Sequence, residues 1–107
     1  MLQSTTLKFL KDVKKNNNKM WFDGHRKQYD TVKSDFLLLV EHLITDIASF
    51  DKPIGNLEAK KCTFRINRDV RFSKNKDPYK SNLAAYFNKD GKKGIGAGYY
   101  LQQQFNL

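Results

Sequence analysis

An apolar pattern of helical period over residues 21–50 is the feature that most constrains the fold. Its apolar side chains recur every three or four positions, so they share one face of a helix. The members of this stripe are Phe22, Tyr29, Val32, Phe36, Val40, Leu43, Ile47 and Phe50. The pattern predicts one long amphipathic helix whose apolar face covers a core. Gly24 is a poor helix former near its start, and Pro53 with Gly55 predicts its end and a turn.

A shorter helix is predicted ahead of the long one. Hydroxyl side chains at 4–6 can cap its start, and the three asparagines at 16–18 end it. Asn18 can also cap the helix that follows. The apolar positions of the short helix are Leu7, Leu10 and Val13.

After residue 55 the apolar period falls from 3.6 to 2, which is the period of a strand with one buried face. One such stretch is CTFRIN at 62–67, with inward positions Cys62, Phe64 and Ile66. A second alternation covers 83–87, and GYYLQQQF from Gly98 predicts a third strand after a turn at 88–94. Helices followed by about three strands predict an α+β fold, with the helices packed on one face of an antiparallel or mixed sheet.

Positive charge is concentrated in one part of the chain. The 107 residues carry a formal charge of +9, and residues 60–80 alone hold eight lysines and arginines against two aspartates. The field of such a protein attracts partners that carry phosphate or carboxylate groups. The length predicts a single domain over 1–107.

The composition also disfavours several classes of protein. The single cysteine, Cys62, cannot form an internal disulfide and lacks the partners of a zinc site. No apolar run has the length of a signal-peptide core or of a membrane span. The protein is therefore expected in the cytoplasm, without a membrane partner, a metal or a cofactor.

Several stretches together resemble a known family. They are NNNKMWF at 16–22, Tyr29, KKCTFRINRDVRFSKNKDPYK at 60–80 and the tyrosine pair after GIGAG at 94–98. From about Leu7 to Leu101 the chain resembles the conserved hypothetical proteins of domain-of-unknown-function family 2461. The resemblance implies no particular reaction. Family members usually continue with further strands and helices, so this chain resembles a short or truncated member whose last strand would expose an edge for self-association.

The basic segment 65–80 is the candidate binding site. Guanidinium and ammonium groups bond well to phosphate or carboxylate, and the candidate ligands are Arg65, Arg68, Arg71, Lys74 and Lys80. The alternative is a structural network of these side chains with Asp69, Asp77 and helix acids, and both interpretations stay open. Asp69 is expected to orient the arginines instead of acting as a general base, because neighbouring cations keep it ionised.

Aromatic side chains interleave with these cations, as they do on surfaces that bind single-stranded nucleic acid. Tyr79 and Tyr86 are the candidates for stacking, and Tyr79, which follows a proline, is expected to be exposed. The period-2 pattern places Phe64 and Phe87 in the core instead. His25 is expected to be packed within the helical stripe, and His42 to be solvated.

Two further motifs carry little chemistry. Ser73 and Lys74 point apart on an extended chain, so they do not form a nucleophile and base pair. GIGAG lacks the lysine and serine of a phosphate loop and precedes a strand. We interpret it as a point of close backbone approach.

Three functions remain open at this stage. The preferred one is a binding module for a phosphorylated or otherwise anionic ligand. The second is a nucleic-acid-associated protein that adds Tyr79 and Tyr86 to the basic segment. The third is an enzyme whose arginines position an anionic substrate and whose reacting residues are undetermined.

Overall fold

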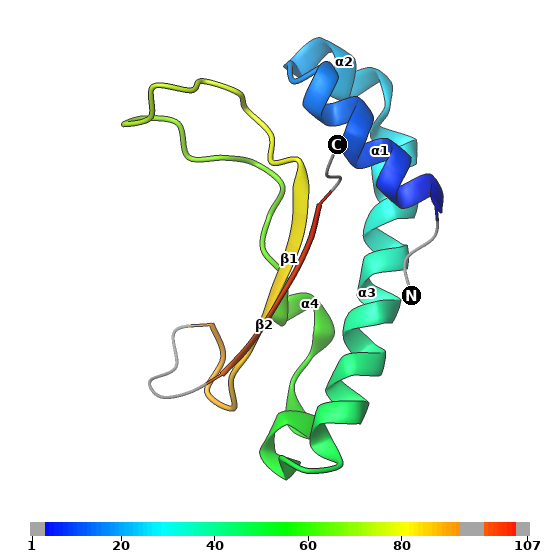
Figure 1. Cartoon of the computed structure of the whole chain (residues 1–107), viewed down its shortest axis with the longest axis vertical. Coiled ribbons are helices and arrows are strands. Elements are labelled where there is room, and N and C mark those ends of the chain that lie inside the picture. The colour runs from blue at the N-terminus through cyan, green and yellow to red at the C-terminus, as the bar shows by residue number, and fades with distance from the viewer. Residues whose placement is uncertain (1–3, 93–97, 105–107) are drawn as a thin grey trace.

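Helices occupy the first part of the chain and strands the second. The computed structural model describes residues 4–92 and 98–104. In chain order the elements are α1 (Ser4–Lys15), α2 (Lys19–Gly24), α3 (Arg26–Ala48), the 3-10 helix η1 (Lys52–Asn56), α4 (Ala59–Cys62), β1 (Asn82–Phe87) and β2 (Tyr99–Gln104). Figure 1 shows α3 lying along one face of the sheet, with α1 and α2 beside one end of α3. The chain between α4 and β1 loops away from the helices.

The long amphipathic helix is present, but it begins later than predicted. α2 ends at Gly24, and the backbone of His25 leaves the helical region with φ −119° and ψ 19°. α3 then continues for 23 residues. Its buried positions are Val32, Phe36, Val40, Ile44 and Ile47. Phe50 lies beyond the end of α3 and is 71% exposed, so the prediction that it belongs to the buried stripe is wrong.

The three asparagines join α1 to α2 as predicted. α1 ends at Lys15, and Oδ1 of Asn18 accepts a hydrogen bond from the Trp21 N–H at 2.8 Å, which caps α2. The hydroxyl residues at 4–6 lie within α1 instead of preceding it. Thr6 is buried and its hydroxyl donates to Oδ2 of Asp35 at 2.7 Å. This hydrogen bond ties α1 to α3.

β1 and β2 form the sheet that the period-2 pattern predicts for the end of the chain. They are antiparallel, with Ala85 opposite Leu101 and Tyr86 opposite Tyr100. Alternate residues of a strand share one face, so Leu83, Ala85 and Phe87 lie together on the inner face of β1, and all three are buried. Figure 1 places α3 over the sheet, and these side chains belong to the same core cluster as the buried face of α3.

The described residues include the start of the turn between the strands and Gly98 at its end. Gly91 has φ 84° and its N–H donates to the carbonyl of Asn88. Of GIGAG only Gly98 lies within the described residues. A Cβ added to Gly98 would lie 2.5–2.7 Å from ring and hydroxyl atoms of Tyr86. The prediction of a close backbone approach is therefore confirmed at this glycine.

The strand predicted at 62–67 is wrong, and the sheet has two strands in the described part of the chain. Cys62 ends α4, and only isolated bridges follow, Thr63 with Ala85 and Asn67 with Tyr79. The two bridges enclose four positions of the first segment, from 63 to 67, but six positions of the facing segment, from 79 to 85. The facing segment therefore bulges, and no regular ladder of hydrogen bonds forms. Phe64 is 40% exposed, so its predicted place in the core is also wrong. Phe87, at 1%, is in the core as predicted.

Candidate anion-binding site

The basic segment folds back on itself as a hairpin-like loop. The Arg68 N–H donates to the Pro78 carbonyl at 2.9 Å, and the Lys80 N–H donates to the Ile66 carbonyl at 2.8 Å. These bonds close a loop over residues 68–78, which we call the 68–78 loop. Its base therefore has the backbone pairing of a short antiparallel pair. Its tip extends away from the helices (Figure 1), and residues 71, 72 and 74–77 are exposed.

An asparagine from the helical part of the chain anchors this base. The side-chain amide of Asn17 donates to the Tyr79 carbonyl at 2.8 Å, and its Oδ1 accepts from the Tyr79 N–H at 2.9 Å. Tyr79 itself is 6% exposed and stacks on Phe22, with ring centroids 4.0 Å apart. The prediction that Tyr79 is exposed is wrong, because the ring fills the core between α2 and the loop.

Two of the five predicted cations brace the loop itself. The Arg68 guanidinium donates to the carbonyls of Asn75 and Asp77, at 3.3 and 3.0 Å. The Arg71 guanidinium bonds both carboxylate oxygens of Asp69, at 3.0 and 2.8 Å. This fork geometry is the structural network that the sequence left open as the alternative.

The environment of Asp69 is that of an orienting acid. Hydrogen bonds from the Arg71 side chain and backbone lower the pKa of its carboxyl group, and the charge of Arg65 lowers it further. A carboxylate held ionised in this way is a weak general base. Lys74 is exposed on the same loop.

Two lysines, Lys80 and Lys92, lie beside the exposed ring of Phe64. Nζ of Lys80 lies 5.7 Å and Nζ of Lys92 lies 5.1 Å from the ring centroid. Arg65 follows Phe64 directly in the chain and adds a third positive charge. We call Arg65, Lys80 and Lys92, with the Phe64 ring, the Phe64 cluster. Within residues 4–92 and 98–104, none of its three cations forms an ion pair.

The charges of the Phe64 cluster repel one another. Burial is the largest cause that lowers the pKa of the Lys80 amino group, and the charges of Arg65 and Lys92 lower it further. The ammonium form of Lys80 is therefore less favoured here than in water. Lys92 is held by a hydrogen bond of 2.8 Å to the Thr63 carbonyl, a neutral acceptor that does not compensate its charge.

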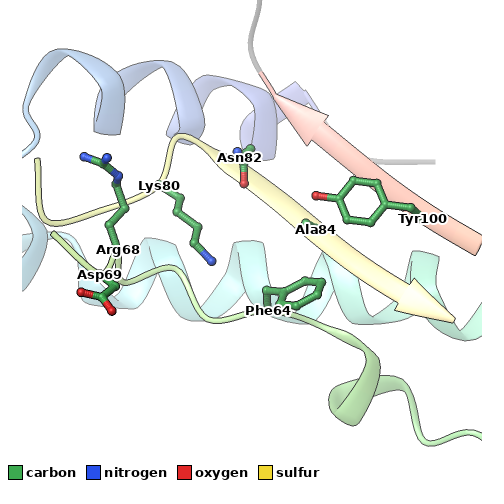
Figure 2. A pocket seen from close by; sticks show the side chains of 7 residues that line it. All are labelled: Phe64, Arg68, Asp69, Lys80, Asn82, Ala84 and Tyr100. Atoms are coloured by element: carbon green, nitrogen blue, oxygen red, sulfur yellow. The ribbon is translucent and has the colours of Figure 1, made fainter. Parts of the chain in front are cut away.

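A cleft of about 400 Å³ adjoins this cluster on the outer face of the sheet. Figure 2 shows its lining: Phe64, Arg68, Asp69, Lys80, Asn82, Ala84 and Tyr100. In this view the Lys80 side chain extends from the segment just before β1 toward Phe64, and Tyr100 comes from β2. The cleft thus brings the basic segment and both strands together.

A second cleft of about 800 Å³ lies between α3 and residues 60–67. Phe64 lines both clefts, so the Phe64 cluster stands between them. The second cleft adds cations from α3 and α4, and Asp30 is the only acid among its described lining residues. Its charged lining consists of Arg26, Asp30, Lys33, Lys60, Arg65 and Lys92.

The exposed aromatic rings differ from those predicted. Tyr86 is half-buried where Gly98 crosses its ring. The exposed rings near the basic segment are Phe64 at 40%, Tyr100 at 61% and Phe72 at 96%. The period-2 pattern did not indicate this result, because residues 63–67 form isolated bridges in place of a regular strand.

Other candidate groups take structural places. His25 is partly buried, stacks on Trp21 at 4.0 Å, and shares a hydrogen bond between its Nδ1 and the Trp21 carbonyl. His42 is exposed, as predicted. Cys62 is buried, and its burial raises the pKa of the thiol. No group of three or more His, Cys, Asp or Glu side chains that could hold a metal ion occurs among the described residues.

Lys92 and Asn17 are the site residues that the sequence did not indicate. Lys92 lies in the turn after β1, outside the dense basic segment, and only the fold brings it to Phe64. Asn17 is one of three consecutive asparagines, and no local pattern separates it from its neighbours. In the parts of the chain that the structure covers, no helix is both long and apolar enough to cross a membrane.

The fold and the site define a class of small α+β proteins in which a braced basic loop stands beside an antiparallel sheet. The chain belongs to the family described as conserved hypothetical protein DUF2461, whose model matches residues 5–106. This match confirms the resemblance found in the sequence. No curated protein and no solved structure matches the chain.

Proposed function

We propose that the protein binds an anionic ligand, through a phosphate or carboxylate group, at the Phe64 cluster. The observation that carries the proposal is the pair of lysines at one exposed ring, with Arg65 close enough to repel Lys80, and none of these three cations forms an ion pair in the described residues. An anion placed among them would relieve their mutual repulsion and receive charge-assisted hydrogen bonds. The lowered pKa of Lys80, which burial causes first and the charges of Arg65 and Lys92 lower further, is consistent with this reasoning.

The proposal narrows the predicted ligand set. Arg65 and Lys80 remain as ligands and Lys92 joins them. Arg68 and Arg71 act indirectly, because their side chains hold the 68–78 loop in shape. The role of Lys74 as a ligand of the anion stays a prediction. Asp69 orients Arg71, and no reacting group is proposed.

Thermal denaturation with inorganic phosphate tests the proposal. At a concentration 100 times its dissociation constant, a ligand of the folded state adds about 2.7 kcal/mol to the free energy of unfolding. For a protein of this size that raises the melting temperature by about 10 °C. Potassium chloride of equal ionic strength is the reference, because general screening must not be counted as binding.

Matched lysine variants locate the effect. Lys80→Ala should abolish the shift with phosphate, whereas Lys27→Ala, an exposed lysine on α3 that lines neither cleft, should keep it. In the unaltered protein the pKa of Lys80, followed by NMR of its side chain, should rise when phosphate is added. An equal phosphate shift in both variants would refute the assignment to the Phe64 cluster.

A further inference from the structure

Phe72 is a large apolar side chain held almost entirely in solvent. It is 96% exposed, and the only ring contact it makes in the described residues is with the Arg71 guanidinium, 5.7 Å from its centroid. A fully exposed phenylalanine gains nothing from folding. Such residues gather where a partner covers them.

The loop that carries Phe72 is braced on both sides of it. The Ser73 N–H donates to the Val70 carbonyl at 3.3 Å, and Nζ of Lys76 donates to the same carbonyl at 2.7 Å. The bonds from Arg68 and Arg71 described above hold the rest of the loop. The ring is therefore presented on a pre-organised tip, which lowers the entropy cost of binding.

The charge around Phe72 indicates the chemistry of its partner. Residues 70–76 contain three cations, Arg71, Lys74 and Lys76, and no acid. Asp69, the nearest acid, is already bonded to Arg71 and also lines the smaller cleft. Phe72 is three residues from Asp69, a distance of at most about 11 Å along the chain. The tip and the Phe64 cluster can thus contact one extended anion.

Two more exposed aromatic rings belong to the smaller cleft. Phe64 and Tyr100 line the smaller cleft together with Lys80 (Figure 2). Alternating exposed rings and cations are what a single strand of nucleic acid needs, because its bases stack on rings while its phosphates follow the cations. From this we infer that the anion bound at the Phe64 cluster is a backbone phosphate of single-stranded nucleic acid, with bases stacked on Phe64, Tyr100 and Phe72.

This inference rests on the proposed function, since it names the ligand of the same cluster. An anionic membrane is the less favoured partner. The exposed rings come from three separate parts of the chain and line a cleft in two cases, whereas membrane insertion needs apolar side chains that project together from one surface.

Fluorescence anisotropy with labelled oligonucleotides of about 12 nucleotides, dT and rU, tests the inference at several salt concentrations. Phe72→Ser should weaken binding by about 5- to 150-fold, the range for loss of one stacked base. Phe50→Ser is the matched control, because Phe50 is also exposed but follows the end of α3 that lies away from the loop (Figure 1). That variant should bind as the unaltered protein does.

The salt dependence of the affinity distinguishes the contribution of base stacking from that of the phosphate contacts. Lys80→Ala should reduce the magnitude of the slope of log K against log salt by about 0.7, the value for one phosphate contact to a single strand. Phe72→Ser should lower affinity at every salt concentration and leave the slope unchanged. Both results together support the inference.

Three outcomes would overturn it. They are equal affinities of the Phe72 and Phe50 variants, no oligonucleotide binding at all, or tighter binding to vesicles of phosphatidylserine than to the oligonucleotides. If inorganic phosphate still stabilises the protein through Lys80 in any of these cases, the proposed function stands and only its extension to nucleic acid fails. If phosphate also has no effect, both fail.

Discussion

Asn17 should be the asparagine of the 16–18 triplet on which stability depends most. Its side chain makes two hydrogen bonds to the backbone of Tyr79, which is 6% exposed, and so joins segments 62 residues apart. In Asn17→Ala both bonds disappear and a buried N–H and C=O lose their partner. At about 1 kcal/mol for each bond, and up to about twice that where the backbone group stays unsatisfied, the free energy of unfolding should fall by about 2–4 kcal/mol.

The neighbouring asparagines are the controls for this prediction. Asn18→Ala removes one N-cap and should cost about 1 kcal/mol. Asn16→Ala removes one bond of 3.0 Å to the Asp12 carbonyl and should cost no more. Asn17→Asp keeps the acceptor for the Tyr79 N–H but loses the donor to its carbonyl, so it should fall between Asn17→Ala and the unaltered protein.

Urea denaturation followed by circular dichroism measures these differences, and thermal melting gives a second reading. The midpoint of Asn17→Ala should fall by about 8–16 °C, at about 4 °C per kcal/mol for a protein near 100 residues. A loss no larger than that of Asn18→Ala would refute the reasoning. It would mean that water replaces both bonds at no cost, and that the base of the 68–78 loop needs no anchor.

Further predictions concern the glycine at the sheet, the cysteine and the repelled lysine. Gly98→Ala should lower the free energy of unfolding by about 1–3 kcal/mol through its clash with Tyr86, and Tyr86→Ala in the same chain should remove that extra cost in a double-mutant cycle. Cys62 should react with iodoacetamide far more slowly than free cysteine until the protein unfolds, because it is buried and the pKa of its thiol is raised; equal rates would contradict its burial. Lys80→Met should raise the melting temperature at neutral pH in phosphate-free buffer. The lowered pKa of Lys80 means that the folded state binds this proton less tightly than the unfolded chain, so the destabilisation is complete below the folded-state pKa. It disappears as pH rises past the ordinary value of 10.5, so the difference between variant and unaltered protein should narrow there.

The sequence was most informative where structure depends on local pattern. The apolar stripe of α3, the cap at Asn18, the turn after α3 and the alternation in β1 each depend on residues within a few positions of one another. The pattern failed at His25, where the helix breaks without proline, and at 62–67. There the alternation was correct for a strand, but a bulge in the facing segment prevented a ladder.

For the candidate site, too, the sequence predicted local features and missed those that depend on the fold. Local charge density singled out the basic segment as the unusual part of the chain, and the same segment carries the longest of the motifs that resemble the family. Local charge density could not distinguish Arg68 and Arg71, whose side chains brace the loop, from Lys80, whose side chain lies beside an exposed ring. That distinction depends on which carbonyls and carboxylates each side chain can reach once the loop has closed.

The sequence by itself therefore determined α1 and α3, two strands, the excess of positive charge and the family, because periodicity, capping and composition act over short distances. Only the tertiary structure decided that Tyr79 is buried, that Phe64 and Phe72 are exposed, and that Asn17 and Lys92 meet the basic segment. Burial and ion pairing are properties of groups brought together from distant parts of the chain. They follow from packing, which no short window of sequence contains.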